Sequence, residues 1–137
     1  MTTLDKAREI FRHDRYATGL TGVAIASVGD HEACCTLTVQ PHHCNARDVA
    51  MGGVLYTLAD LSAAVACNTE YLESGELHWV SLDATVHYLS PAPAGAALSA
   101  RCTALKHGRT TALYQTIIES PDNGKRIAIV ETTMVKV

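Results

Sequence analysis

The chain has few charges and no excess of basic residues. Its 137 residues include 11 Lys and Arg against 14 Asp and Glu, which gives a formal net charge of −3. Nucleic acids and anionic membranes are recognised through clustered basic residues, so this balance argues against both as partners. Aromatic residues are also scarce, with five Tyr, one Trp and one Phe. They do not line up with basic residues as a base-stacking surface requires.

The sequence also offers little that favours export or disulfide bonding. No N-terminal stretch combines a charged start, an apolar run and a small-residue cleavage site. The cysteines are odd in number, scattered and mostly flanked by apolar residues: Cys34, Cys35, Cys44, Cys67 and Cys102. This usage is typical of small buried hydrophobic residues in a reducing compartment. We therefore expect a cytoplasmic protein.

No internal repeat, low-complexity tract or linker divides the chain, which predicts one domain over residues 1–137. Thr2 and Asp5 have the spacing of a capping box at the start of a short amphipathic helix. Period-two alternation between turn residues predicts strands elsewhere. The expected order is a helix within 1–14, strands over 22–28 and 32–39, a helix over 50–68, and strands over 79–89, 96–105, 110–119 and 126–137. The expected turns lie at Gly29-Asp30, at 106–109 and at Asn123-Gly124.

The segment "VAMGGVLYTLADLSAAVACN" (49–68) is the most apolar part of the chain, yet it contains one carboxylate, Asp60. Its two glycines and this acid argue against a membrane span. A helix that is apolar nearly all round must be enclosed on most sides. Wrapping a curved antiparallel sheet around the helix is the simplest way to enclose it, which predicts an α+β fold.

That arrangement is the hotdog fold, and the residues around the helix resemble a known family. The stretch "TVQPHHCNARDVAMGGVLYTLADLSAAVACN" is similar to the signature of PaaI-type hotdog thioesterases. In that family an Asn stands six residues before a His-Gly-Gly, and a Leu-x-Asp follows on the central helix. The matching residues here are Asn45, Gly52, Gly53 and Asp60. "VSLDATVHYLSPAPAG" and "KHGRTT" resemble the third strand and the Gly-Arg turn, so the resemblance covers roughly residues 35–115.

The resemblance implies an acyl-CoA thioesterase that hydrolyses a thioester to a free acid and CoA. Backbone N–H groups at a helix start are unpaired and lie at the positive end of its dipole, so the Gly52 N–H is expected to serve as oxyanion donor. Asp60 is expected to act as general base toward water or as nucleophile, and the sequence leaves both routes open. A structural, hydrogen-bonded carboxylate is the alternative. No cofactor is expected, because coenzyme A is part of the substrate.

Gly52 and Asp60 cannot act on one carbonyl from the same helix. They are eight residues apart, hence about 12 Å along the helix axis. Both groups must reach within roughly 3 Å of the reacting carbonyl. The site is therefore expected to pair the glycine of one subunit with the aspartate of another. The resemblance implies the same, since hotdog active sites lie at dimer interfaces, so we expect a homodimer and a homotetramer built as a dimer of dimers.

Further site residues follow from the resemblance, and each has an ordinary structural alternative. Asn45 is expected near the thioester, although Asn is also a common turn residue. Ser81 matches a strand position where some relatives use Ser or Thr to hold the attacking water, and a solvent-facing strand residue is the alternative. Asp83, two residues later, is interpreted as a neighbour without a catalytic role.

The regions that contact coenzyme A in the family correspond to residues 88–93 and 106–111. The expected substrate and coenzyme A contacts are Met51, Gly53, Tyr88, Ser90, Pro91, Lys106, His107, Gly108 and Arg109. Arg109 suits phosphate through its forked donors. An ordinary solvated hairpin end is the alternative for residues 106–109.

Met51 departs from the family pattern, because it stands where the family has His before the glycines. Methionine supplies neither a donor nor a proton, but it offers adaptable apolar contact. This departure motivates one alternative, a protein that binds an acyl-CoA or an aromatic acid without turnover. A hotdog hydratase or dehydratase is a further alternative. The latter typically pairs an acid with a histidine, and no His lies on the predicted helix. The identity of the acyl group is left open.

No metal site is expected. His42, His43 and Cys44 are adjacent, and adjacent side chains rarely converge on one ion. No second Cys or His pair stands at finger-like spacing. Cys67 and Cys102 have no evident partner base in the sequence, which argues against a thiolate nucleophile.

Overall fold

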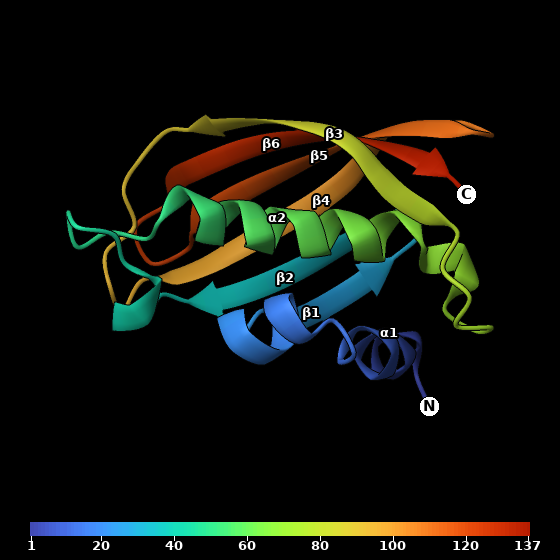
Figure 1. The fold of residues 1–137 in the computed structure, drawn as a ribbon, viewed down its shortest axis with the longest axis horizontal. Helices are drawn as coiled ribbons and strands as arrows, with labels where there is room; N and C mark the ends of the chain where they lie inside the picture. The colour runs from blue at the N-terminus through green and yellow to red at the C-terminus, as the bar shows by residue number, and fades with distance from the viewer.

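Six antiparallel strands form one curved sheet, and a long helix lies across it (Figure 1). The computed structural model describes residues 1–137. The strands are β1 (Ala24–Gly29), β2 (Glu32–Thr38), β3 (Trp79–Tyr88), β4 (Ala97–His107), β5 (Thr111–Ser120) and β6 (Lys125–Lys136). The order β1-β2-β4-β5-β6-β3 makes β1 and β3 the two edges. The expected α+β hotdog fold is confirmed.

Two α-helices and three short helical turns complete the chain. They are α1 (Thr3–Phe11), the π-helical turn η1 (Arg15–Thr21), the 3-10 turn η2 (Pro41–His43), α2 (Gly52–Cys67) and the 3-10 turn η3 (Thr69–Tyr71). The expected capping box of α1 is present, because the Thr2 hydroxyl accepts from the Asp5 N–H and the Asp5 carboxylate accepts from the Thr2 N–H, both at 3.0 Å. η1 was not expected from the sequence. No helix is long and apolar enough to cross a membrane.

α2 is enclosed by the sheet because its sequence is apolar on nearly every side. Leu58, Ala59, Ala63 and Val65 are fully buried. The small alanines let the helix approach the strands closely, while each buried leucine stabilises the fold by about 1.5–3 kcal/mol. The one buried hydroxyl of this face, Ser62, donates to the Leu58 carbonyl at 2.7 Å, so it needs no partner from the sheet.

The end of α2 is fixed to the start of β3 by one buried amide. Asn68 donates to the carbonyls of Ala64 at 2.9 Å and Trp79 at 3.1 Å. Its oxygen accepts from the N–H groups of His78 and Trp79, both at 3.0 Å. Asn68 therefore sets where the chain leaves α2 and where β3 begins.

Two of the three expected turns lie slightly elsewhere. The β1–β2 turn comprises Asp30 and His31 instead of Gly29 and Asp30, because Gly29 stays in the ladder opposite Glu32. His31 takes the left-handed conformation at φ 52°. The β4–β5 turn begins at Gly108 instead of Lys106, because Lys106 and His107 still pair with Leu113 and Ala112. The hairpin at Asn123-Gly124 is confirmed, with Gly124 at φ 70° in a loop between Ser120 and Lys125.

The apolar face of edge strand β3 is largely uncovered in the single chain. Val80 is 47% exposed, Leu82 63% and Tyr88 54%. Alternation correctly predicts the strand. Ala84 and Val86 in its middle are half-buried against the core, so the uncovered apolar side chains lie toward its two ends. An edge strand with exposed apolar side chains is a surface suited to pairing.

Candidate active site

A cavity of about 510 Å³ lies at the N-terminal end of α2. It forms where the loop before α2 meets the segment that follows β3. Its lining comprises Asn45, Val49, Ala50, Gly52, Leu55, Tyr88, Leu89, Ser90, Pro91 and Ala92. Ligand pockets of this size are usual for small molecules and cofactors. The structure thus brings together five residues expected from the sequence: Asn45, Gly52, Tyr88, Ser90 and Pro91.

The first residue of α2 is in close contact with Tyr88. The Tyr88 hydroxyl donates to the Gly52 carbonyl at 3.0 Å. A Cβ atom at position 52 would lie 2.9 Å from Tyr88 Cζ, closer than non-bonded carbons approach. A side chain at position 52 would therefore require the half-exposed Tyr88 ring to move.

The start of α2 presents unpaired donors beside this cavity. Met51, the residue before the helix, provides no side-chain cap. The N–H groups of Gly52 and Gly53 make no hydrogen bond within the chain. Such groups, at the positive end of the helix dipole, are suited to a negatively charged oxygen.

Asn45 organises the loop that leads into α2. Its side-chain oxygen accepts from the N–H of Arg47 at 2.9 Å and of Val49 at 3.5 Å, and its own N–H donates to the Val49 carbonyl at 2.8 Å. The turn role that the sequence left open is therefore present. The side-chain amide nitrogen of Asn45 is not used in these bonds.

The buried ring of His43 supports the same loop from behind. Its Nδ1 accepts from the Gln40 N–H at 2.9 Å, and its Nε2–H donates to the Thr21 carbonyl at 2.8 Å. Its backbone carbonyl accepts from the Met51 N–H at 2.9 Å. Both ring nitrogens are thus engaged in holding the loop in place.

Asp60 lies in the middle of α2 and is half-buried. Burial raises the pKa of its carboxyl above the ordinary value, and the negative charge of Asp14 raises it further. The Tyr56 hydroxyl donates to Asp60 Oδ1 at 3.5 Å and partly offsets this rise. A carboxylate with a raised pKa is a stronger base, which suits proton transfer near neutral pH.

Asp60 is not part of the lining of the cavity at Gly52. The two residues lie on one continuous helix, about 12 Å apart along its axis. In a single chain they therefore cannot act on the same carbonyl.

Three other expected residues, Gly53, Ser81 and Met51, lie outside the cavity lining. Ser81 is exposed on β3 and pairs with Met134 of β6. Met51 is 57% exposed. A Cβ atom added at Gly53 would lie 3.7 Å from the terminal methyl group of Met51. The Met51 side chain therefore lies over the start of α2.

The predicted coenzyme A contacts near the β4–β5 turn lie in a separate place. Lys106, Gly108 and Arg109 line a second depression of about 420 Å³, which shares no residue with the first cavity. His107 takes no part in that lining and instead contacts Glu70. A single chain thus divides the expected coenzyme A contacts between two surfaces.

Sequence reasoning missed several residues of this region. Val49, Ala50, Leu55, Leu89 and Ala92 complete the cavity lining. Tyr56 could have been found, because it stands four residues before Asp60 on a helix and so shares its face. No sequence pattern links Asp14 to Asp60, because the two residues are distant in the sequence and approach each other only in the folded chain.

Comparison with known proteins agrees with this architecture. Residues 48–127 match the thioesterase superfamily. The chain belongs to the thioesterase superfamily. It is 32% identical to the acyl-coenzyme A thioesterase PaaI of Escherichia coli, over 79% of this chain and 73% of that protein. It is 30% identical to human acyl-coenzyme A thioesterase 13, over 77% of this chain and 74% of that protein.

Structural comparison extends the similarity to thioesterases beyond the matched segment. The structure of E. coli PaaI aligns with a TM-score of 0.83 at 26% identity, covering 99% of this chain and 96% of that one. The expected recognition of a PaaI-type hotdog thioesterase is confirmed. The superfamily match contains Gly52, Asp60 and Ser81 but begins after Asn45.

Proposed function

We propose that this protein is an acyl-CoA thioesterase that hydrolyses its substrate to a free acid and CoA. The observation that carries the proposal is on α2, where a half-buried Asp60 with a raised pKa shares a helix with unpaired N–H groups beside the cavity. The relatives named acyl-coenzyme A thioesterases support the substrate class.

In the proposed reaction, Asp60 removes a proton from water while the water oxygen bonds to the thioester carbon. The negative charge that develops on the carbonyl oxygen is stabilised by a hydrogen bond that the Gly52 N–H of the partner subunit donates. Collapse of the intermediate breaks the carbon–sulfur bond, and the proton held by Asp60 passes to the departing thiolate. Direct attack by Asp60, followed by hydrolysis of the acyl-enzyme anhydride, is the second route.

The proposed site requires a homodimer. The support for it is the separation of Gly52 and Asp60 along one helix, together with the exposed apolar side chains of β3. We also propose a homotetramer, because Lys106 and Arg109 line a surface apart from the cavity. A neighbouring subunit would then bring these cations to the coenzyme A phosphates, with Asn45 near the thioester and Ser81 near the attacking water.

The five free cysteines, four of them buried, support a reducing compartment, and we propose the cytoplasm.

Asp60→Asn tests the catalytic assignment. We expect turnover of acyl-CoA substrates to fall by about 10²–10⁴-fold, the usual contribution of a general base. The measurement is thiol release from a panel of acyl-CoA thioesters. Full activity in a folded variant would show that Asp60 is neither the general base nor the nucleophile.

The fold of this variant is expected to persist. A carboxyl whose pKa is raised on folding disfavours the folded state once the pH exceeds its ordinary pKa, because the folded state then holds a charge in a poorly hydrated place. Asparagine removes that charge, so stability at neutral pH should be at least that of the wild type. Circular dichroism and urea denaturation provide the control.

A binding protein without turnover is the second candidate, and the exposed Met51 favours it. Isothermal titration calorimetry run beside the hydrolysis assay separates the two functions. Binding of acyl-CoA with no thiol release from any substrate would support the binding protein and overturn the thioesterase.

A further inference from the structure

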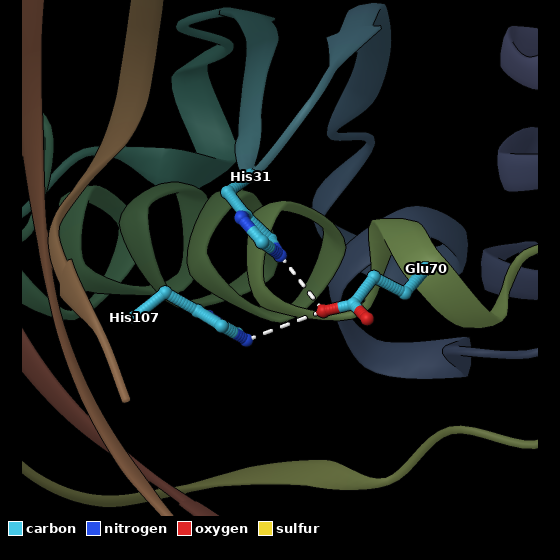
Figure 2. A group of neighbouring side chains, drawn as sticks. All are labelled: His31, Glu70 and His107. Atoms are coloured by element: carbon cyan, nitrogen blue, oxygen red, sulfur yellow. Dashed lines mark hydrogen bonds and ion pairs between the residues drawn. The ribbon is translucent and has the colours of Figure 1, made fainter. Parts of the chain in front are cut away.

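Three metal-ligand side chains converge beyond the C-terminal end of α2 (Figure 2). His31 comes from the β1–β2 turn, Glu70 from η3, and His107 from the end of β4. Glu70 Oε1 lies 2.8 Å from His31 Nε2 and 3.4 Å from His107 Nε2. No other three His, Cys, Asp or Glu side chains of the chain bring their ligand atoms within 4.8 Å of one another.

We propose that His31, Glu70 and His107 form a binding site for a divalent transition-metal ion, and that Zn²⁺ is the preferred ion. Two imidazole nitrogens and one carboxylate oxygen are a donor set that Zn²⁺ prefers, with water as fourth ligand. Ligand atoms about 2.0–2.1 Å from a tetrahedral ion lie roughly 3.3 Å from one another. The nitrogen–oxygen separations of 2.8 Å and 3.4 Å are already close to that value.

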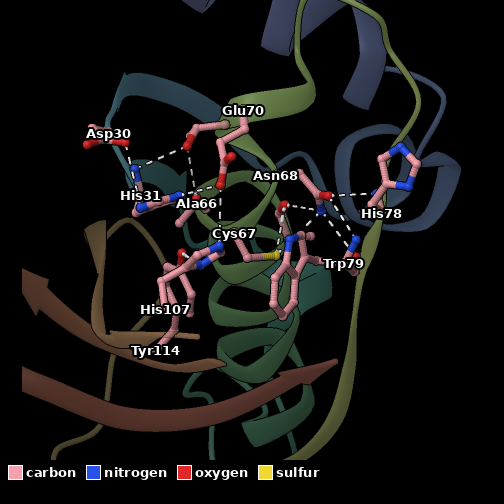
Figure 3. A network of polar contacts seen from close by, with 12 residues as sticks. Asp30, His31, Ala66, Cys67, Asn68, Glu70, His78, Trp79, His107 and Tyr114 are labelled. Carbon is pink, nitrogen blue, oxygen red and sulfur yellow. Dashed lines mark hydrogen bonds and ion pairs between the residues drawn. The ribbon is translucent and has the colours of Figure 1, made fainter. Parts of the chain in front are cut away.

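The other nitrogen of each imidazole also faces an oxygen (Figure 3). His107 Nδ1 is 2.8 Å from the hydroxyl of the fully buried Tyr114. His31 Nδ1 is 3.6 Å from Asp30 Oδ1. Histidines that bind metals almost always hold their second nitrogen in this way, which fixes the tautomer and the ring orientation.

The two rings must turn apart for an ion to bind. Their centroids are 3.9 Å apart at an interplanar angle of 16°, so the two Nε2 lone pairs lie in nearly parallel planes and do not point at one common position. His107 is held between Tyr114 and the indole of Trp79, with ring centroids 5.9 Å and 4.6 Å away, and its side chain is 13% exposed. The His31 side chain is 25% exposed and lies on a two-residue turn. His31 is therefore the ring that tilts.

The cluster is reached from solvent through its carboxylate. The Glu70 side chain is 50% exposed, so an ion can enter from solvent.

The site is distinct from the cavity at Gly52, and none of its three residues lines the depression that contains Lys106 and Arg109. The cavity lies at the first turn of α2 and the cluster beyond its last, and a helix of 16 residues is about 24 Å long. A bound ion would join the β1–β2 turn, the end of α2 and the β4–β5 hairpin. Its role is to stabilise the fold, and the proposal does not depend on thioester hydrolysis.

Titration of the chelator-treated full chain with ZnCl₂ tests the site. We expect calorimetry to give one ion per chain and thermal unfolding to move to higher temperature as ZnCl₂ rises. A spectrum with Co²⁺ is expected to show the absorption of a tetrahedral ion. The absence of saturable binding by the wild type would overturn the proposal.

Two variants and a matched control identify the ligands. Glu70→Gln keeps the shape of the side chain but loses its charge, and His31→Asn suits the left-handed backbone at position 31. Each is expected to weaken Zn²⁺ binding at least about tenfold. His13→Asn removes an exposed histidine elsewhere and should leave binding unchanged. Equal affinity in the wild type and in both ligand variants would mean that Zn²⁺ binds elsewhere, and would overturn the assignment of these ligands.

Discussion

Three influences set the pKa of Asp60, and they act in different directions. Burial and the charge of Asp14 raise the pKa, while the hydrogen bond from Tyr56 lowers it. Two of these influences come from single side chains that can be removed without touching the carboxylate. Their opposite signs make it possible to ask whether Asp60 is the group whose ionisation controls the rate.

Tyr56→Phe and Asp14→Asn should therefore move the pH dependence of kcat/KM in opposite directions. A base must be ionised to act, so the rate falls as the pH drops through the pKa of Asp60. Tyr56→Phe is expected to move this acid limb to higher pH, and Asp14→Asn to lower pH. The measurement is kcat/KM for one acyl-CoA substrate across the acid range. If the acid limb of kcat/KM moves in neither variant, a group other than Asp60 controls the rate.

At the scale of the element, the two ends of α2 are built differently. The last turn is tied to β3 by the amide of Asn68, which is 1% exposed. The first turn is left open, with two adjacent glycines and unpaired N–H groups. These glycines look alike in the sequence but meet different surroundings, because only Gly52 lies against Tyr88.

Substituting each glycine in turn should separate packing from helix propensity. Gly52→Ala places Cβ 2.9 Å from Tyr88 Cζ, so the ring must move and its hydrogen bond to the Gly52 carbonyl is weakened; we expect the free energy of unfolding to fall by about 1 kcal/mol. Gly53→Ala meets only the Met51 methyl at 3.7 Å and should be neutral or stabilising by up to about 1 kcal/mol. Urea denaturation measures both changes.

The double variant Gly52→Ala with Tyr88→Ala provides the control for this comparison. Because it removes the ring that the new Cβ meets, it should recover most of the stability lost by Gly52→Ala alone. If the double variant recovers nothing, the close contact with Tyr88 is not the cause of the loss.

For the whole molecule, the open edge at β3 is the main unpaired feature of the sheet. β3 is hydrogen-bonded only to β6 and carries three largely exposed apolar side chains. A second chain placed along this edge would cover them. The proposed site needs such a partner, so assembly and activity should be lost together.

Leu82→Lys is expected to weaken the dimer at least about 100-fold, because a symmetric interface contains two copies of each lost apolar contact. Leu82 is 63% exposed in the single chain, so the monomer itself should remain folded. Sedimentation velocity and specific activity, both followed against protein concentration, measure the effect. Leu105→Lys alters a leucine of β4 that is 53% exposed and should retain the dimer. A fully active Leu82→Lys monomer would contradict the composite site.

The sequence by itself determined the local features and the family. The capping box of α1, the apolar helix that contains Asp60, and the strands follow from patterns within a few residues, because hydrogen bonding and alternation act over that range. The family resemblance added cavity residues from two distant segments, namely Asn45, Gly52 and Tyr88.

Only the tertiary structure decided which distant side chains meet. The periodicity of a strand says which residues share a face, but it does not fix the register or the surface opposite that face. The contact of Gly52 with Tyr88, the charge of Asp14 near Asp60, and the one-residue shift of the β1–β2 turn all depend on packing. The same packing brings His31, Glu70 and His107 together, because the β1–β2 turn, η3 and the end of β4 meet beyond the last turn of α2.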